Sequence, residues 1–358
     1  MINRETATYK RTYAEDMALY RLPLTRWTVI AIAILSFVVF PLFATDYVLN
    51  LANLIAVACL GAIGLNILVG MSGQISIGHA AFMSVGAYTA AVLSVRFNVP
   101  WIAAMLAGGV LSAGIGIVIG IPSLRIKGLY LAVATLAAQL IIEWTINHST
   151  WISGGSGASI YVHKPTLFGY EIKSNRDMYW LILVVLVLGI VFALNLTRSH
   201  LGRSFIAVRD RDIAAEIIGI NIFGARLTAF GISSFYAGIT GVLYTYYYGV
   251  ANYEAFTLTT SIEFLAMIII GGLGSVLGSI FGAIFISLVP ILLDLGLTRI
   301  GMGWFGMEGA KVASISSSLQ LMLFGGLIMF FLVVEPDGLN KLWNNIKDYF
   351  RVWPFPYL

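Results

Sequence analysis

The amino-acid sequence predicts an all-α polytopic membrane protein with about ten transmembrane helices, some of them broken or re-entrant. Composition is the first reason, because 59% of the 358 residues are hydrophobic and only 11% are charged, against about 25% charged residues in a soluble domain. The second reason is that apolar runs near the roughly 20 residues needed to cross a bilayer recur along the chain. The third is that two glycine-rich, polar stretches interrupt these runs.

The chain divides into a basic N-terminal segment over 1–26, a transmembrane domain over 27–335 and a tail over 336–358. The first apolar run is longer than the hydrophobic part of a signal peptide, about 7–15 residues, so we interpret it as a spanning helix. The runs at 80–96 and 262–273 are short, which either reflects broken helices or misplaced boundaries. The ten runs are 27–45, 47–70, 80–96, 100–121, 128–145, 178–197, 225–250, 262–273, 276–297 and 315–334.

Charge distribution predicts that both termini lie on the cytoplasmic side. If the chain crosses at every run, most of the 21 Lys and Arg residues fall on the side that holds the N-terminus. The tail over 336–358 then lies in the cytoplasm as well. The longest outside loop, 146–177, is rich in Gly, Ser and aromatic residues, and it suits a docking surface and a plain connector equally well.

The stretch 61–89 is too polar and too glycine-rich for a plain spanning helix. Glycine permits unusual backbone angles and close approach of chain segments, and an unwound segment between two half-helices offers N–H and C=O groups to a polar solute. Packing of helices through small residues is the structural alternative for any single glycine. We predict that this stretch lines a substrate path, with these residues in it: Asn66, Gly73, Gln74, Ser76, Gly78, His79 and Phe82.

A second stretch, 271–284, has glycines and serines at spacings comparable to the first. Both stretches follow a run that goes inward in the predicted topology, which suits a parallel internal repeat, although glycine-rich membrane segments also resemble one another by chance. Transporter sites often form where repeats meet. We therefore add four residues of this stretch to the predicted path: Gly271, Gly272, Gly274 and Ser275.

The largest inside loop, 198–226, predicts a short helix over 212–218. Asp210 and Asp212 stand at its N-terminus, where carboxylates favour the helix dipole, and Gly219 ends it. We expect three isoleucines to bury one side of this helix: Ile213, Ile217 and Ile218. The loop suits docking to a soluble partner and a solvated connector equally well from its residues alone.

Several classes of function are excluded or disfavoured. The chain lacks the G-x-x-x-x-G-K-[ST] phosphate loop, and a net charge of +4 spread along a membrane protein does not indicate nucleic-acid binding. The carboxylates near apolar runs fall close to predicted helix ends, which argues against an ion-coupled secondary transporter. A catalytic or metal site is not expected, since the four histidines are scattered: His79, His148, His163 and His200.

Two motifs together resemble the LivM-type permeases of branched-chain amino acid ABC importers. They are Gly-Gln-x-Ser-x-Gly-His-Ala-Ala-Phe at 73–82 and Arg-Asp-x-Asp-x-Ala-Ala-Glu-x-x-Gly at 209–219. The resemblance covers most of 47–335 and implies the type II ABC importer permease core, in a bacterial or archaeal plasma membrane (the inner membrane of a Gram-negative cell). By position it implies that 209–219 is the helix that couples to an ATPase, with these residues: Arg209, Asp210, Asp212, Ala215, Glu216 and Gly219.

The same resemblance implies a multi-part importer. Its partners would be a LivH-type second permease, two cytoplasmic ABC ATPase subunits and a periplasmic or surface-tethered solute-binding protein. No cofactor is expected in this chain, because ATP and Mg²⁺ would bind to the ATPase subunits. The sequence leaves open an importer of the same type for urea, short amides or aromatic and other carboxylates. A stand-alone secondary transporter is the alternative from another class.

Overall fold

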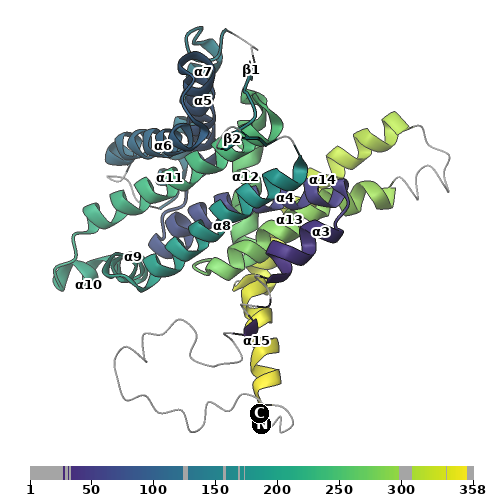
Figure 1. The fold of residues 1–358 in the computed structure, drawn as a ribbon. Helices are drawn as coiled ribbons and strands as arrows, with labels where there is room; N and C mark the ends of the chain where they lie inside the picture. Colours follow the sequence, from purple (N-terminus) through teal and green to yellow (C-terminus); the bar gives the residue numbers. More distant parts are fainter. Residues whose placement is uncertain are drawn as a thin grey trace.

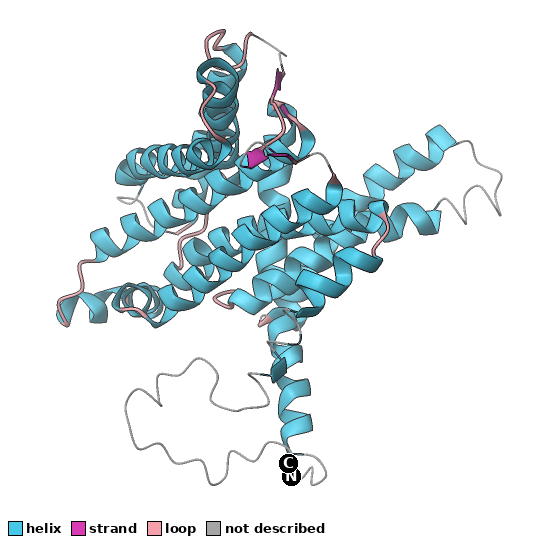
Figure 2. Cartoon of the chain, in the orientation of Figure 1, coloured by secondary structure: helices cyan, strands magenta, loops and turns pink. Residues whose placement is uncertain are grey.

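The computed structural model describes residues 27–28, 31, 34–123, 128–155, 159–167, 170–172, 174–297, 309–335 and 337–352. Helices dominate this part of the chain, with small pairs of strands at one end of the bundle (Figure 2). The basic segment 1–26 lies outside the described residues, as do Arg125 and Lys127, so the structure does not test their predicted place.

The helices are long over most of the chain and short in the region of 198–226. Two five-residue segments are π-helices, and one four-residue segment is a 3-10 helix. In chain order the helical elements are η1 (Leu35–Val39), α3 (Phe40–Phe43), α4 (Asp46–Asn66), η2 (Ile67–Met71), α5 (His79–Phe97), α6 (Trp101–Ser123), α7 (Leu129–His148), α8 (Asn175–Arg198), α9 (His200–Asp210), α10 (Asp212–Ile217), α11 (Ile222–Tyr248), η3 (Tyr253–Phe256), α12 (Leu258–Gly271), α13 (Val276–Leu297), α14 (Gly309–Val334) and α15 (Gly338–Val352).

Seven helices in the described chain are long and apolar enough to cross a membrane: α4 with η2, α5, α6, α7, α8, α11 and α13. They match seven of the ten predicted runs. The run at 262–273 forms α12, which has 14 residues and is too short for a separate crossing. An eighth span is counted only if Ser318–Val334 and Gly338–Tyr349, bent by 52°, are taken together. The run at 27–45 is described only in part, so the predicted count of ten is not confirmed.

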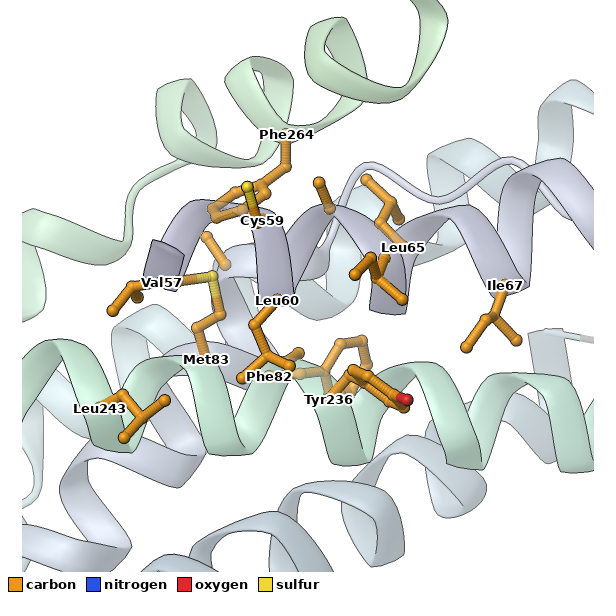
Figure 3. Packing of buried hydrophobic residues seen from close by; sticks show 14 of the residues in the cluster. Val57, Cys59, Leu60, Leu65, Ile67, Phe82, Met83, Tyr236, Leu243 and Phe264 are labelled. Atoms are coloured by element: carbon orange, nitrogen blue, oxygen red, sulfur yellow. The ribbon is translucent and has the colours of Figure 1, made fainter. Parts of the chain in front are cut away.

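α4 is the central helix of the bundle. It packs against α8, α11, α12 and α13, and every residue from Cys59 to Ser72 is buried. Figure 3 shows α4 with Phe264 of α12 on one side and Tyr236 and Leu243 of α11 on the other. Polar side chains such as Asn66 are costly in contact with lipid, and this explains why the stretch with the polar motif lies in the interior.

Small residues bring α5, α6 and α11 into direct contact. A Cβ placed on Gly86 would lie 2.2 Å from the Gly238 carbonyl oxygen, so the backbones of α5 and α11 touch at this crossing. Ser112 of α6 donates a hydrogen bond to the Phe82 carbonyl and lies 2.8 Å from the Ser234 carbonyl. Close backbone approach and serine hydrogen bonds are the usual way in which helices associate inside a membrane. Here they place α5 firmly against α11.

Four two-residue strands modify the predicted all-α fold. β1 (Ile160–Tyr161) pairs with β4 (Val250–Ala251), and β2 (Thr166–Leu167) pairs with β3 (Tyr170–Glu171), both antiparallel. The loop 146–177 is therefore fastened to the end of α11 rather than free. Arg96 lies 5.5 Å from the ring centroid of Trp151, which adds a cation–π contact between this loop and α5.

Candidate functional site: the junction of two glycine-rich turns

The first polar stretch forms a break between two helices, as the sequence predicts. α4 continues into the π-helix η2, and the helical backbone then stops at Ser72. Residues 73–78 are non-helical, with Gly73 at φ 71°, and α5 begins at His79. Although this turn has no regular structure, half of its residues (Gln74, Ser76 and Gly78) are buried. Its backbone groups therefore need partners inside the protein.

The second stretch forms a tighter turn between α12 and α13. α12 ends at Gly271, Gly272 follows at φ 117° and Gly274 at φ 81°, and α13 starts at Val276. Both positive φ values are in the region that L-residues with a side chain rarely adopt. The glycines of this stretch therefore set the backbone course of the turn.

Asn66 joins the two turns. Its side-chain Nδ2 donates to the Ser275 carbonyl at 2.8 Å and to Ser279 Oγ at 2.6 Å, and its Oδ1 accepts from the Gly274 N–H at 2.8 Å. Only 1% of Asn66 is exposed. A buried amide with three partners satisfies groups that water cannot reach, so Asn66 holds the second turn against the end of α4.

Gly70 lets the two turns touch. A Cβ on this residue would lie 1.9 Å from Asn66 Oδ1 and 2.2 Å from the Gly274 nitrogen. Neither distance is possible between non-bonded atoms, so a side chain at position 70 would separate the turns. The two glycine-rich stretches, predicted separately from the sequence, thus meet at one place, which we call the glycine junction (Asn66, Gly70, Gly73, Gly274 and Ser275).

Arg209, the next-to-last residue of α9, reaches into the glycine junction. Its Nη1 donates to the Gly70 carbonyl at 2.7 Å, and its Cγ lies 2.8 Å from the place that a Cβ on Gly73 would occupy. On its other side the guanidinium pairs with Asp210, with Nε and Nη2 both 2.9 Å from Oδ1. One side chain therefore connects the loop 198–226 to both the end of η2 and the first turn.

Gln74 makes a second link to the same loop. Its Nε2 donates to the Arg226 carbonyl at 3.1 Å and also contacts Ser72 Oγ, and Arg226 pairs with Asp212 of α10 at 3.6 Å. Gln74 Oε1 is buried and has no hydrogen-bond partner among the described residues. The first turn is thus tied to α9, to α10 and to the start of α11.

α10 is a six-residue helix at the outer edge of the bundle (Figure 1). Asp212 Oδ1 accepts from the Ile213 N–H at 2.9 Å, and the helix ends at Ile217, two residues before Gly219, which has φ 88°. The helix is one residue shorter than predicted, and Arg211 rather than Asp210 is its N-cap. Glu216 is on its exposed side.

The prediction that three isoleucines bury one side of α10 is wrong. Ile213, Ile217 and Ile218 are 72%, 81% and 74% exposed, and Ala215 is the buried residue of this helix. The reason is that α10 packs on the rest of the chain only through its narrow alanine side. Its large apolar side chains therefore form an exposed patch, which we call the α10 patch (Ile213, Ile217 and Ile218).

The remaining residues of the predicted path lie along the start of α5 and do not reach the glycine junction. His79 is buried with its ring 5.3 Å from that of Phe264, and Phe82 packs edge-on against Phe230 at 5.6 Å. Gly78 is backed by the Thr135 carbonyl, 2.5 Å from the place of a Cβ, and the buried Ser76 Oγ accepts from the Gly78 N–H at 3.4 Å. These side chains are enclosed by packing contacts and do not line an open passage in this conformation.

The chain matches the family model described as branched-chain amino acid transport system, permease component, over residues 47–333. This range includes both glycine-rich turns, α9 and α10. The chain belongs to this family. The match ends before α15, so the last described helix of this permease lies outside the matched residues.

Similar proteins in other organisms are named as permeases of the same kind. The permease is 29% identical to the high-affinity branched-chain amino acid transport system permease protein LivM of Salmonella typhimurium, over 84% of this chain and 72% of the relative. For LivM of Escherichia coli the identity is 29%, over 87% and 73% of the two chains. The probable LivM of Methanocaldococcus jannaschii is 27% identical over 66% and 67%. No solved structure matches the chain.

The structure of the permease adds three residues that the sequence analysis missed. Gln139 Oε1 accepts from the Ala81 N–H at 2.7 Å, Ser261 Oγ accepts from the Ala80 N–H at 2.9 Å, and Thr135 Oγ1 accepts from the Ile77 N–H at 3.0 Å. They satisfy N–H groups at the start of α5 that have no partner within the helix. Thr135 and Gln139 stand four residues apart in the apolar run 128–145, and that spacing, which puts both on one face of a helix, was the available signal.

Proposed function

We propose that this chain is a membrane-spanning permease subunit of an ATP-driven importer and forms part of the path for branched-chain amino acids. The family match and the names of the relatives support this assignment. The working assembly would contain a LivH-type second permease, two cytoplasmic ATPase subunits that bind ATP and Mg²⁺, and a solute-binding protein. No described feature favours urea, amides or other carboxylates, and none favours a stand-alone transporter.

The α10 patch is the observation that supports coupling to an ATPase. Ile213 and Ile217 on this six-residue helix and Ile218 directly after it are all more than 70% exposed, and they form an apolar projection beside charged residues. Such a surface suits insertion into a groove of a soluble partner. Under this proposal the apolar contacts of the α10 patch would supply the binding free energy for the ATPase subunit, and the charges of Asp210 and Glu216 at its edge would orient that subunit.

Arg209 would transmit motion from α10 to the membrane interior. α10 follows α9 directly, and Arg209 of α9 holds the Gly70 carbonyl in the glycine junction. When the ATPase pair closes on ATP, a displacement of α9 and α10 would pull on η2 and on the turn at 73–78. The tie from Gln74 to Arg226 would move the start of α11 at the same time.

The path itself would open when the contacts around the start of α5 change. In the conformation described here Gln74, Ser76 and His79 are buried among packed helices. We infer that this is a closed state, and that separation of α5 from α7 or α12 would expose backbone groups at the start of α5. The residues Asn66, Gly73, Gly78, Phe82 and the second turn would then serve mainly to hold the broken helices in place.

The direct test is uptake by the reconstituted importer. Proteoliposomes containing both permeases, the ATPase subunits and the solute-binding protein should accumulate radiolabelled leucine only when ATP and Mg²⁺ are present on the ATPase side. Unlabelled isoleucine and valine should compete, while urea, acetamide and benzoate should not.

Two results would contradict the proposal. Leucine uptake by this chain without ATPase subunits would indicate a secondary transporter. Competition by urea or benzoate, with none by isoleucine, would retain the importer and replace its substrate class.

A further inference from the structure

The C-terminal helix α15 has an apolar stripe that is about half exposed in the described chain. Leu342, Trp343, Ile346 and Tyr349 recur at helical spacing, and they are 46%, 48%, 50% and 55% exposed. Asn344, which is also exposed, lies on the opposite side of the helix. A helix of this kind, apolar on one side and polar on the other, needs an apolar surface to be stable.

The first turn of α15 is fixed to the transmembrane bundle. A Cβ on Gly338 would lie 2.6 Å from both the Gly272 nitrogen and the Ile270 carbonyl oxygen, so the helix starts directly on the second glycine-rich turn. Trp343 also packs against Phe281 of α13, with ring centroids 5.6 Å apart. α15 is therefore not a loosely attached tail at its beginning.

A cluster of charges fixes the direction in which the chain leaves α14. Lys341 Nζ lies 2.9 Å from Glu335 Oε1 and 3.3 Å from Asp337 Oδ2. Both carboxylates belong to the short link between the helices, and the axes of Ser318–Val334 and Gly338–Tyr349 differ by 52°. α15 thus departs from the direction of the spanning helix that precedes it.

By length α14 could cross a bilayer without α15, although its part from Ser318 to Val334 is counted as a span only together with Gly338–Tyr349. Its 26 residues extend about 39 Å at 1.5 Å per residue, compared with a hydrocarbon core of about 30 Å. The next helix therefore starts at the membrane surface. Leu273 in the second turn and Leu277 in α13 are 43% and 51% exposed, so apolar side chains are also exposed near the place where α15 begins.

We propose that α15 is a membrane-surface helix whose stripe of Leu342, Trp343, Ile346 and Tyr349 lies in the boundary between lipid headgroups and acyl chains. The second turn contacts both Gly338 and Arg209, whose Nη1 is 3.1 Å from the place of a Cβ on Gly274. α15 therefore lies on the same membrane face as α9 and α10. Trp and Tyr are enriched at this depth, and an amphipathic helix gains stability there by burying its apolar side.

A test uses cysteine labelling of the full chain in lipid nanodiscs. Cys59, the single cysteine, is buried and can be replaced by alanine to give a background without thiols. Ile346→Cys places a label in the stripe, and Asn344→Cys is the matched control on the opposite side of the same helix. Each variant is labelled with a polarity-sensitive fluorophore and exposed to aqueous iodide or to nitroxide-bearing lipids.

The expected result is that the label at position 346 is quenched at least twofold more strongly by nitroxide lipids than the label at 344, and that iodide shows the reverse order. Equal quenching by iodide at both positions would overturn the proposal. Shielding at 346 that requires the second permease would overturn it too, because a protein would then cover the stripe. These outcomes do not depend on transport, so they are independent of the importer assignment.

Discussion

Asn66 shows at the residue scale what can be read from a sequence and what cannot. An amide inside an apolar run is costly unless it is paired, so its presence alone indicates an internal role. Its partners Gly274, Ser275 and Ser279 lie more than 200 positions away. These hydrogen-bond partners are determined by how α12 and α13 pack against α4, which the sequence does not show. From the sequence we assigned Asn66 to a substrate path, and its hydrogen bonds to the second turn were not predicted.

Replacing Asn66 by leucine should weaken the whole bundle. The part-buried Gly274 N–H and Ser275 carbonyl and the buried Ser279 hydroxyl would lose a partner, and each unsatisfied buried group costs about 1–3 kcal/mol. We expect a lower midpoint of thermal unfolding in detergent, measured by the fraction that remains monodisperse in size-exclusion chromatography. Asn195→Leu, at an exposed position of α8, is the control and should behave as the parent. An unchanged midpoint in Asn66→Leu would show that Asn66 does not hold the junction.

Arg209→Ala should impair transport more than assembly. The substitution removes the bond from α9 to the Gly70 carbonyl but leaves the α10 patch in place. We expect leucine uptake to fall about tenfold or more, which corresponds to about 1.4 kcal/mol in coupling, while the ATPase subunits still co-purify. Arg209→Lys should restore part of the uptake, because an ammonium can still donate to the carbonyl.

The control for Arg209 is Arg203→Ala on the exposed side of the same helix. Its Nη1 contacts only the Arg198 carbonyl in the described chain, at 3.1 Å. Similar losses of uptake in the two variants would mean that positive charge on α9, and not the contact with Gly70, is what transport requires.

At the scale of elements, the position of α10 along the chain was predicted correctly, but the side of the helix that packs against the bundle was not. Local chemistry was sufficient for its start at Asp212 and for its end just before Gly219, since a carboxylate at an N-terminus and a left-handed glycine act within one turn. Burial is different, because it depends on what the helix packs against. The structure puts Ala215 against the bundle and leaves the isoleucines outside.

Replacing all three isoleucines of the α10 patch by serine should abolish ATPase docking without destabilising the chain. These side chains are 72–81% exposed, so the folded chain loses little when they are removed. The measurement is co-purification of the ATPase subunits with a tagged permease. The same three positions changed to valine keep an apolar patch and should retain most of the binding. Normal co-purification of the serine variant would exclude α10 as the main docking element.

At the scale of the whole molecule, hydrophobicity predicted ten spans, and seven of them match described helices with boundaries that differ by a few residues. The failure at 262–273 has a clear cause. Apolar composition indicates burial, but α12 is buried against α4 and α13 within the bundle instead of crossing alone. The strands β1 and β4 could not be predicted either, because two residues are too few to give a pattern.

The predicted sidedness can be checked on whole cells. In the Cys59→Ala background, Glu216→Cys in α10 should react with a membrane-impermeant maleimide only after the cells are opened. Trp151→Cys, which is 65% exposed in the loop 146–177, should react in intact cells. Reaction of Glu216→Cys in intact cells would reverse the topology and place α10 away from any cytoplasmic ATPase.

The π-helix η2 implies a specific sensitivity to chain length. It holds one residue more than an α-helical turn would need, and it ends just before the turn at 73–78. Deleting one residue from Ile67–Met71 would let an ordinary α-helix form there, and the flanking backbone would keep nearly the same direction because only the additional residue of the π-helical turn is lost. The residues within the turn would change places, so the Gly70 carbonyl that accepts from Arg209 would no longer be held where Arg209 reaches it. A single-codon deletion at this place is therefore expected to break the contact with Arg209 while leaving the ends of α4 and α5 aligned.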